Sequence, residues 1–132
     1  MWYFERNFIA LMKMLACAQI NERAQVEFEL AGTHVRLTLQ EQTRYTMLLD
    51  IHQRIPGKDS TLLPDLHFTV RVYVDAQLAE VVSYQGYQRL QARYDYPNRH
   101  MLYRDEKRQA NLLLHDWLST CARLNYREAI AI

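Results

Sequence analysis

The chain has 132 residues, and its 16 lysines and arginines almost balance its 15 aspartates and glutamates. This balance excludes the large net positive charge that is typical of proteins that bind nucleic acid or anionic membranes. Apolar residues make up 49% of the chain and glycine and proline number three each, which argues against disorder and predicts one globular domain spanning residues 1–132.

The first predicted element is an amphipathic helix over about residues 2–17. The apolar residues that recur there at helical spacing are Phe4, Phe8, Leu11, Met12 and Leu15. Lys13 interrupts the apolar run, which argues against a secretory signal, and no run approaches the roughly twenty apolar residues that a membrane span needs. The two cysteines lack CxxC spacing and are typical of reduced, buried thiols. We therefore expect a cytoplasmic protein with no membrane partner.

From about residue 25 to residue 95 the apolar period changes to two, which predicts about six strands. Turn residues at 31–33 and 75–77 join consecutive strands into antiparallel hairpins, and a proline- and glycine-containing stretch at 56–64 predicts a surface loop. The last strand is expected at residues 88–94.

A second amphipathic helix is predicted at about residues 104–124, because Asp105 and Glu106 suit the positive end of the helix dipole. Its apolar stripe comprises Leu113, Leu114, Trp117, Leu118, Cys121 and Leu124. Two helices and a mainly antiparallel sheet with one polar face predict a two-layer α+β sandwich, with both helices packed on the apolar face.

No motif for catalysis or cofactor binding occurs in the chain. It contains no phosphate-binding glycine loop, no nucleophile elbow and no HExxH sequence, and its five histidines are scattered. The sequence therefore predicts neither a cofactor nor a metal site.

Arginines and tyrosines are concentrated between residues 84 and 108, where six basic residues face three acidic ones. Guanidinium groups grip phosphate and tyrosine rings stack on bases, so this mixture suits a nucleotide or single-stranded RNA. The other interpretation is that the basic residues pair with acidic neighbours and the tyrosines cover the sheet edge. The chain lacks the large net positive charge that is usual for such binders, which favours this second interpretation, and RNA binding stays an alternative.

The polar face of the predicted sheet is a second candidate site. Its polar residues are Arg36, Thr38, Arg44, Thr46, Asp50, His52, Arg71, Glu80 and Arg93. If Arg44 and Arg71 lie on adjacent strands, they repel each other unless an acid such as Asp50 or Asp95, or a bound anion, lies between them. An anion or carboxylate site is one hypothesis, and a solvated ladder of cross-strand ion pairs is the other.

The chain also resembles a known family. The stretches that carry the likeness are TRYT at 43–46, VY at 72–73, AEV at 79–81, ARYDYPN at 92–98, RDEK at 104–107 and WL at 117–118, together with the helix around Asn7 and Phe8. They resemble the YqiB-like family, small proteobacterial proteins classed as a domain of unknown function, number 1249. The resemblance implies a bacterial cytoplasmic protein and brings no established activity, cofactor or catalytic residue.

We expect a small, non-catalytic binding or regulatory protein that meets a protein partner or a phosphate-bearing ligand through a Tyr- and Arg-rich surface. The candidate binding residues are Arg44, Arg71, Glu80, Arg93, Tyr94, Asp95, Tyr96 and Arg104. Arginines would supply charge-assisted hydrogen bonds and tyrosines flat contact area.

Two other hypotheses use some of the same residues. The first is a hydrolase-like enzyme in which Glu80 or Asp95 acts as general acid or base beside an arginine clamp. The second is a structural network in which Arg93 and Asp95 tie the last strand to the start of the C-terminal helix through Arg104 or Asp105. The sequence does not predict an oligomeric state.

Overall fold

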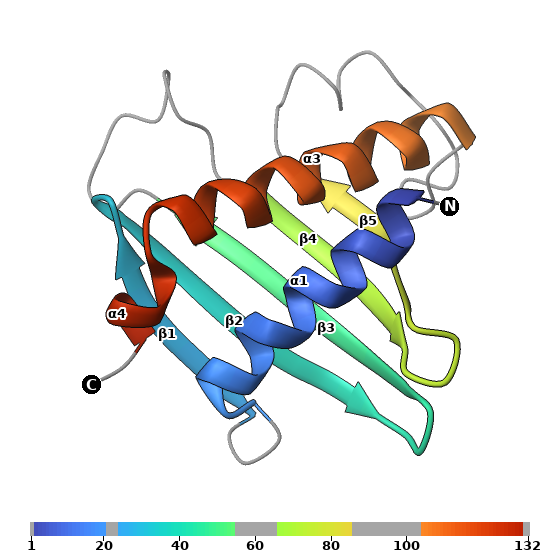
Figure 1. Ribbon diagram of the computed structural model, residues 1–132, viewed down its shortest axis with the longest axis horizontal. Helices are drawn as coiled ribbons and strands as arrows, with labels where there is room; N and C mark the ends of the chain where they lie inside the picture. Colours follow the sequence, from blue (N-terminus) through green and yellow to red (C-terminus); the bar gives the residue numbers. More distant parts are fainter. Residues whose placement is uncertain (1, 21–23, 55–65, 86–103, 131–132) are drawn as a thin grey trace.

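The computed structural model describes residues 2–20, 24–54, 66–85 and 104–130, without the side chains of residues 85 and 104–106. Within these residues a five-stranded antiparallel sheet carries its helices on one face (Figure 1). The strands are β1 (Gln25–Leu30), β2 (Thr33–Gln42), β3 (Thr46–Arg54), β4 (Leu66–Tyr73) and β5 (Leu78–Gln85). The helices are α1 (Trp2–Ala18), α3 (Arg104–Arg123) and α4 (Tyr126–Ile130). The predicted α+β class and the placement of the helices are confirmed.

The sheet is a meander in which each strand pairs with the next along the chain. The tightest connection joins β1 to β2 through Ala31 and Gly32, whose φ angles are 52° and 81°. Positive φ at both central residues is the geometry that matches the twist of a two-residue hairpin. Gly32 adopts it without steric cost.

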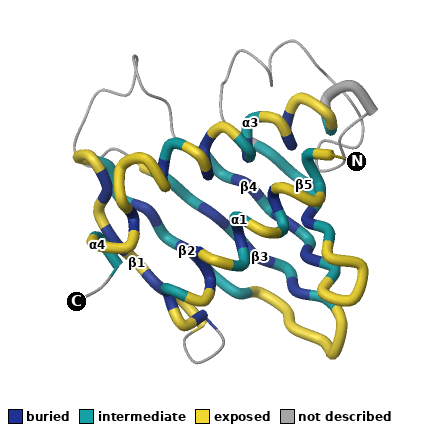
Figure 2. The backbone as a smooth tube through the Cα atoms, in the orientation of Figure 1, coloured by how far each residue is buried: buried dark blue, intermediate teal, exposed yellow. Residues whose placement is uncertain are grey.

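The core forms on one face of the sheet, because successive side chains of a strand point to opposite faces. Along β1 to β4 buried residues alternate with more exposed ones (Figure 2). Strand residues with almost no exposure are Val35, Leu37, Leu49, Ile51, Phe68, Val70, Val72, Ala79 and Val81. Helices contribute Leu11, Met14, Leu15, Ala110, Leu114, Leu118 and Cys121 to the same core. One face of the sheet is therefore apolar and covered, and the other face is left open.

The predicted strand count differs from the structure, which has five strands in the part of the chain it describes. The sixth strand was predicted at residues 88–94, which lie outside the described residues. At the C-terminal end α3 stops at Arg123, and a short helix that the pattern did not predict follows it. Asn125 adopts a left-handed φ of 65° between the two helices, a conformation that ends helices.

The buried stripe of α1 is rotated from the predicted one. Asn7 and Met14 are fully buried, whereas the predicted Phe4, Phe8 and Met12 are only half-buried. Asn7 faces inward because its Nδ2 donates to the main-chain oxygen of Asn111 in α3 at 3.0 Å. This hydrogen bond ties the buried side of α1 to α3.

Asn111 joins three elements. Its Oδ1 accepts the main-chain N–H of Val81 in β5 at 3.0 Å, and its Nδ2 donates to the Lys107 main-chain oxygen at 2.7 Å. The β4–β5 register skips one residue, so that Val82 bulges between Val81 and Ser83. Because a bulge disrupts the ladder locally, the Val81 amide takes its partner from the helix. None of the described helices is long and apolar enough to cross a membrane.

Candidate functional site: the open face of the sheet

The open face lies opposite α1, α3 and α4, on the side of the sheet that no described helix covers (Figure 1). It is formed by the alternate strand residues whose neighbours are buried in the core. Its polar members include Glu27, His34, Arg36, Thr38, Asp50, His52, Arg54, His67, Thr69, Arg71, Tyr73 and Glu80. We call this set the open face.

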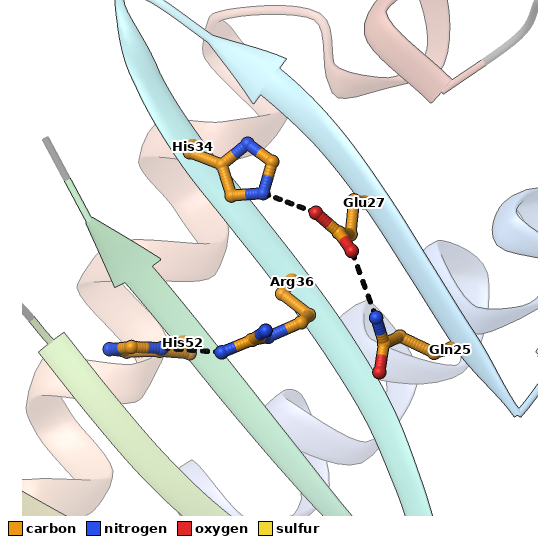
Figure 3. A network of polar contacts seen from close by, with 5 residues as sticks. All are labelled: Gln25, Glu27, His34, Arg36 and His52. Carbon is orange, nitrogen blue, oxygen red and sulfur yellow. Dashed lines mark hydrogen bonds and ion pairs between the residues drawn. The ribbon is translucent and has the colours of Figure 1, made fainter. Parts of the chain in front are cut away.

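Figure 3 shows the network at the β1 side of the open face. His34 Nε2 lies 2.6 Å from Glu27 Oε1, and Gln25 donates to the other oxygen of Glu27 at 2.8 Å. The hydrogen bonds from His34 and then Gln25, aided by the charges of His34 and Arg36, lower the pKa of Glu27 below its usual value. Glu27 is therefore held as a carboxylate by neighbours on its own and the adjacent strand.

Arg36 approaches His52 across the β2–β3 pair. Its Nη2 lies 3.3 Å from His52 Nδ1 (Figure 3). A guanidinium can only donate, so Nδ1 must accept and the neutral ring carries its hydrogen on Nε2. The contact fixes the orientation of one imidazole in the middle of the face.

Asp50 anchors the next cluster. It accepts from Thr69 at 2.9 Å, also accepts from Gln40, and lies 3.5 Å from His67 Nε2. The rings of His52 and His67 are cross-strand neighbours, with centroids 5.4 Å apart. In the described part of the chain no three histidine, cysteine or acidic residues are placed to hold a metal ion.

Arg71 lies opposite Glu80 in the β4–β5 register. Glu80 is nevertheless engaged elsewhere, because Lys107 Nζ lies 2.5 Å from its Oε2 and Tyr73 donates to its Oε1 at 3.4 Å. Arg71 is half-buried and makes no hydrogen bond or ion pair with another described residue. Its other cross-strand neighbour is Leu48, which offers no acceptor from its side chain.

The structure brings some of the predicted site residues together and separates others. Arg71 and Glu80 face each other as described, whereas Arg44 lies in the β2–β3 turn and stacks on its neighbour Tyr45, with 5.3 Å from Cζ to the ring centroid. The repulsion between Arg44 and Arg71 was predicted for the case that both lie on adjacent strands. This condition is not met, because Arg44 lies in a turn. The residues Arg93, Tyr94, Asp95 and Tyr96 lie outside the described residues, as does the side chain of Arg104.

Sequence reasoning placed His52 on the polar face without predicting its contacts, and it left His34 and His67 among the scattered histidines. In the structure each of the three contacts another polar residue of the open face. Their alternation with buried residues was visible, and the meander order would have placed His52 and His67 side by side. The missing information was the register.

The geometry defines a small α+β protein with one covered and one open, polar sheet face. Residues 10–127 match the family described as a protein of unknown function, DUF1249. The chain is 44% identical to the uncharacterized protein YqiB of Escherichia coli K12 over 117 residues, which cover 89% of this chain and 81% of that protein. The YqiB proteins of E. coli O6:H1 (strain CFT073) and O157:H7 match to the same extent. This chain belongs to the DUF1249 family, as its motifs suggested, and no solved structure matches it significantly.

Proposed function

We propose that this protein is a small binding protein of the bacterial cytoplasm that takes a phosphate-bearing ligand on the open face. Arg71 carries the proposal. It is a half-buried guanidinium with no acceptor among the described residues, and the acid opposite it is already neutralised by Lys107. A guanidinium presents a fork of donors that matches phosphate oxygens.

The neighbours of Arg71 are suited to support a ligand. Thr69 and Tyr73 flank it on the same strand and face, and their hydroxyls are oriented by Asp50 and Glu80. Arg36, His52 and His67 extend the polar surface toward β2. The two cysteines lack CxxC spacing, which is typical of reduced thiols and supports the proposed cytoplasmic location.

The hydrolase-like alternative has less support from the described geometry. A general acid or base needs a concave site near its substrate. Glu80 instead lies on the open face, held by Lys107 and Tyr73, and it does not line the described pocket beneath α3. Binding thus explains the arrangement with fewer assumptions than catalysis.

The test is calorimetric titration with inorganic pyrophosphate and the four ribonucleoside monophosphates at low salt. At least one probe should bind, and Arg71→Gln should weaken it by a factor of roughly 10 to 100, because a charge-assisted hydrogen bond contributes about 1.5–3 kcal/mol. Arg127→Gln is the matched control, since Arg127 is an exposed arginine in α4, on the opposite side of the sheet. Equal losses in both variants, or no binding of any probe, would contradict the proposal.

A further inference from the structure

A pocket of about 370 Å³ lies on the other side of the sheet, beneath α3. Residues of the β1–β2 turn, the end of β3 and the start of β4 line it together with the helix. Its floor and walls include the rings of Phe68, Tyr84 and Trp117 and the side chains of Leu66 and Leu113. Phe68 packs against both other rings, with centroids 5.0 Å from Tyr84 and 6.4 Å from Trp117.

A chain of hydrogen bonds fixes one wall of this pocket. Trp117 Nε1 donates to Gln53 Oε1 at 2.5 Å, and Gln53 Nε2 donates to Thr33 Oγ1 at 3.1 Å. Thr33 in turn donates to the main-chain oxygen of Leu30 at 2.7 Å. Both the indole N–H and the Gln53 oxygen therefore have partners within the wall. The wall offers its apolar surface to a ligand in a preset orientation.

Asp116 and Thr120 form the polar rim of the pocket. They lie one turn apart on α3, and Asp116 is exposed. Asp116 is the single charged residue among those that line the pocket, and it has no hydrogen bond or ion pair with another described residue. A carboxylate beside an aromatic pocket attracts a cation and repels an anion.

We infer that this pocket binds a small amphipathic molecule with an aromatic or alkyl body and a cationic amine head. The body occupies the space among Phe68, Trp117 and Leu66, where it removes apolar surface from water. The amine lies at the rim, where it donates to the Asp116 carboxylate and to the Thr120 hydroxyl. The volume falls within the range of small-molecule sites. The site is independent of the proposed phosphate site, which lies on the opposite face of the sheet.

The test uses 4-phenylbutylamine and 4-phenylbutyrate, which share a body and differ in the charge of the head. Trp117 reports binding, because the chain has two tryptophans and Trp2→Phe leaves Trp117 as the single indole. Trp2 is 52% exposed, so its replacement leaves the core intact. Saturable change in Trp117 emission is expected for the amine, with about threefold to fivefold preference over the carboxylate, the size of a solvent-exposed ion pair.

Asp116→Asn in the same background should abolish the preference while both probes still bind. Asp75→Asn is the control, because Asp75 is an exposed acid in the β4–β5 turn, outside the pocket, and the preference should persist in that variant. Three outcomes would overturn the inference. They are no saturable change at Trp117, equal or tighter binding of 4-phenylbutyrate, and a preference that survives Asp116→Asn.

Discussion

At the scale of single residues, the buried amide of Asn111 is the least expected feature of the core. It is 1% exposed and uses both side-chain atoms, the oxygen for the Val81 N–H and the nitrogen for the Lys107 carbonyl. A buried polar group costs little when it is hydrogen bonded and much when it is not. Asn111 thus stabilises a bulged strand that an apolar residue of the same size would leave with an unpaired amide.

Replacing Asn111 by Leu should lower the free energy of unfolding by about 1–3 kcal/mol, the cost of a buried donor left without a partner. Urea denaturation measures the change. Leu112→Gln provides the control, since Leu112 is 37% exposed on the next position of α3, and a surface change stays within about 0.5 kcal/mol. Wild-type stability in the Asn111→Leu variant would show that the bulge needs no partner from the helix.

Cys121 should lower the free energy of unfolding as the pH becomes alkaline. Burial raises the pKa of its thiol to about 12, above the value near 8.5 of an exposed thiol. Above the unfolded pKa the unfolded chain releases this proton and the folded chain retains it, so the folded state loses stability as pH rises toward 12. The loss approaches roughly 1.4 kcal/mol per pH unit.

The measurement is urea unfolding at several values between pH 7 and pH 11, with Cys121→Ala for comparison. The stability advantage of the wild type over this variant should be largest near pH 7 and should shrink as pH rises. Subtracting the two curves removes the contributions of lysines and tyrosines. The Cys17→Ala control retains Cys121 and so keeps its fall with pH. A constant difference between wild type and Cys121→Ala would refute the expectation.

At the scale of elements, the periodicity of the chain was enough to predict α1, α3 and the hairpins. The alternation of Val35 and Leu37 with Arg36 defined a covered and an open face before any strand was paired. The turn at Ala31 and Gly32 could also be predicted from the sequence, because glycine permits positive φ. These features depend on near neighbours in the chain, which is why the sequence revealed them.

The features that the sequence did not reveal depend on how elements meet. Asn7 was not among the predicted buried residues of α1, because its partner Asn111 lies 104 positions away in the chain. The ion pair of Glu80 with Lys107 joins a strand to a helix, although Arg71 lies opposite Glu80 in the sheet. Predicting either contact needs the position of α3 over β5, which no local pattern encodes.

At the scale of the whole molecule, one sheet separates two different chemical environments. The open face offers guanidinium, imidazole and hydroxyl groups to water, whereas the covered face forms a core and the aromatic pocket beneath α3. The two proposed sites share no residue. An anion at Arg71 and an amine at Asp116 therefore have no common contact through which one would alter the other.

We predict that the two sites bind independently. Sites without shared partners have additive free energies, within about 0.3–0.5 kcal/mol, so saturating 4-phenylbutylamine should change the Kd for the phosphate probe by less than about twofold. In the double variant Arg71→Gln and Asp116→Asn, the phosphate probe should lose as much affinity as in Arg71→Gln alone, and the preference for the amine should be lost as in Asp116→Asn alone. Calorimetry measures binding at the open face, and Trp117 emission measures binding in the pocket. Coupling, if present, must be reciprocal, because each ligand then changes the affinity of the other by the same factor. A reciprocal change larger than threefold would mean that the sheet transmits the occupancy of one face to the other, and that the pocket regulates the open face instead of acting alone.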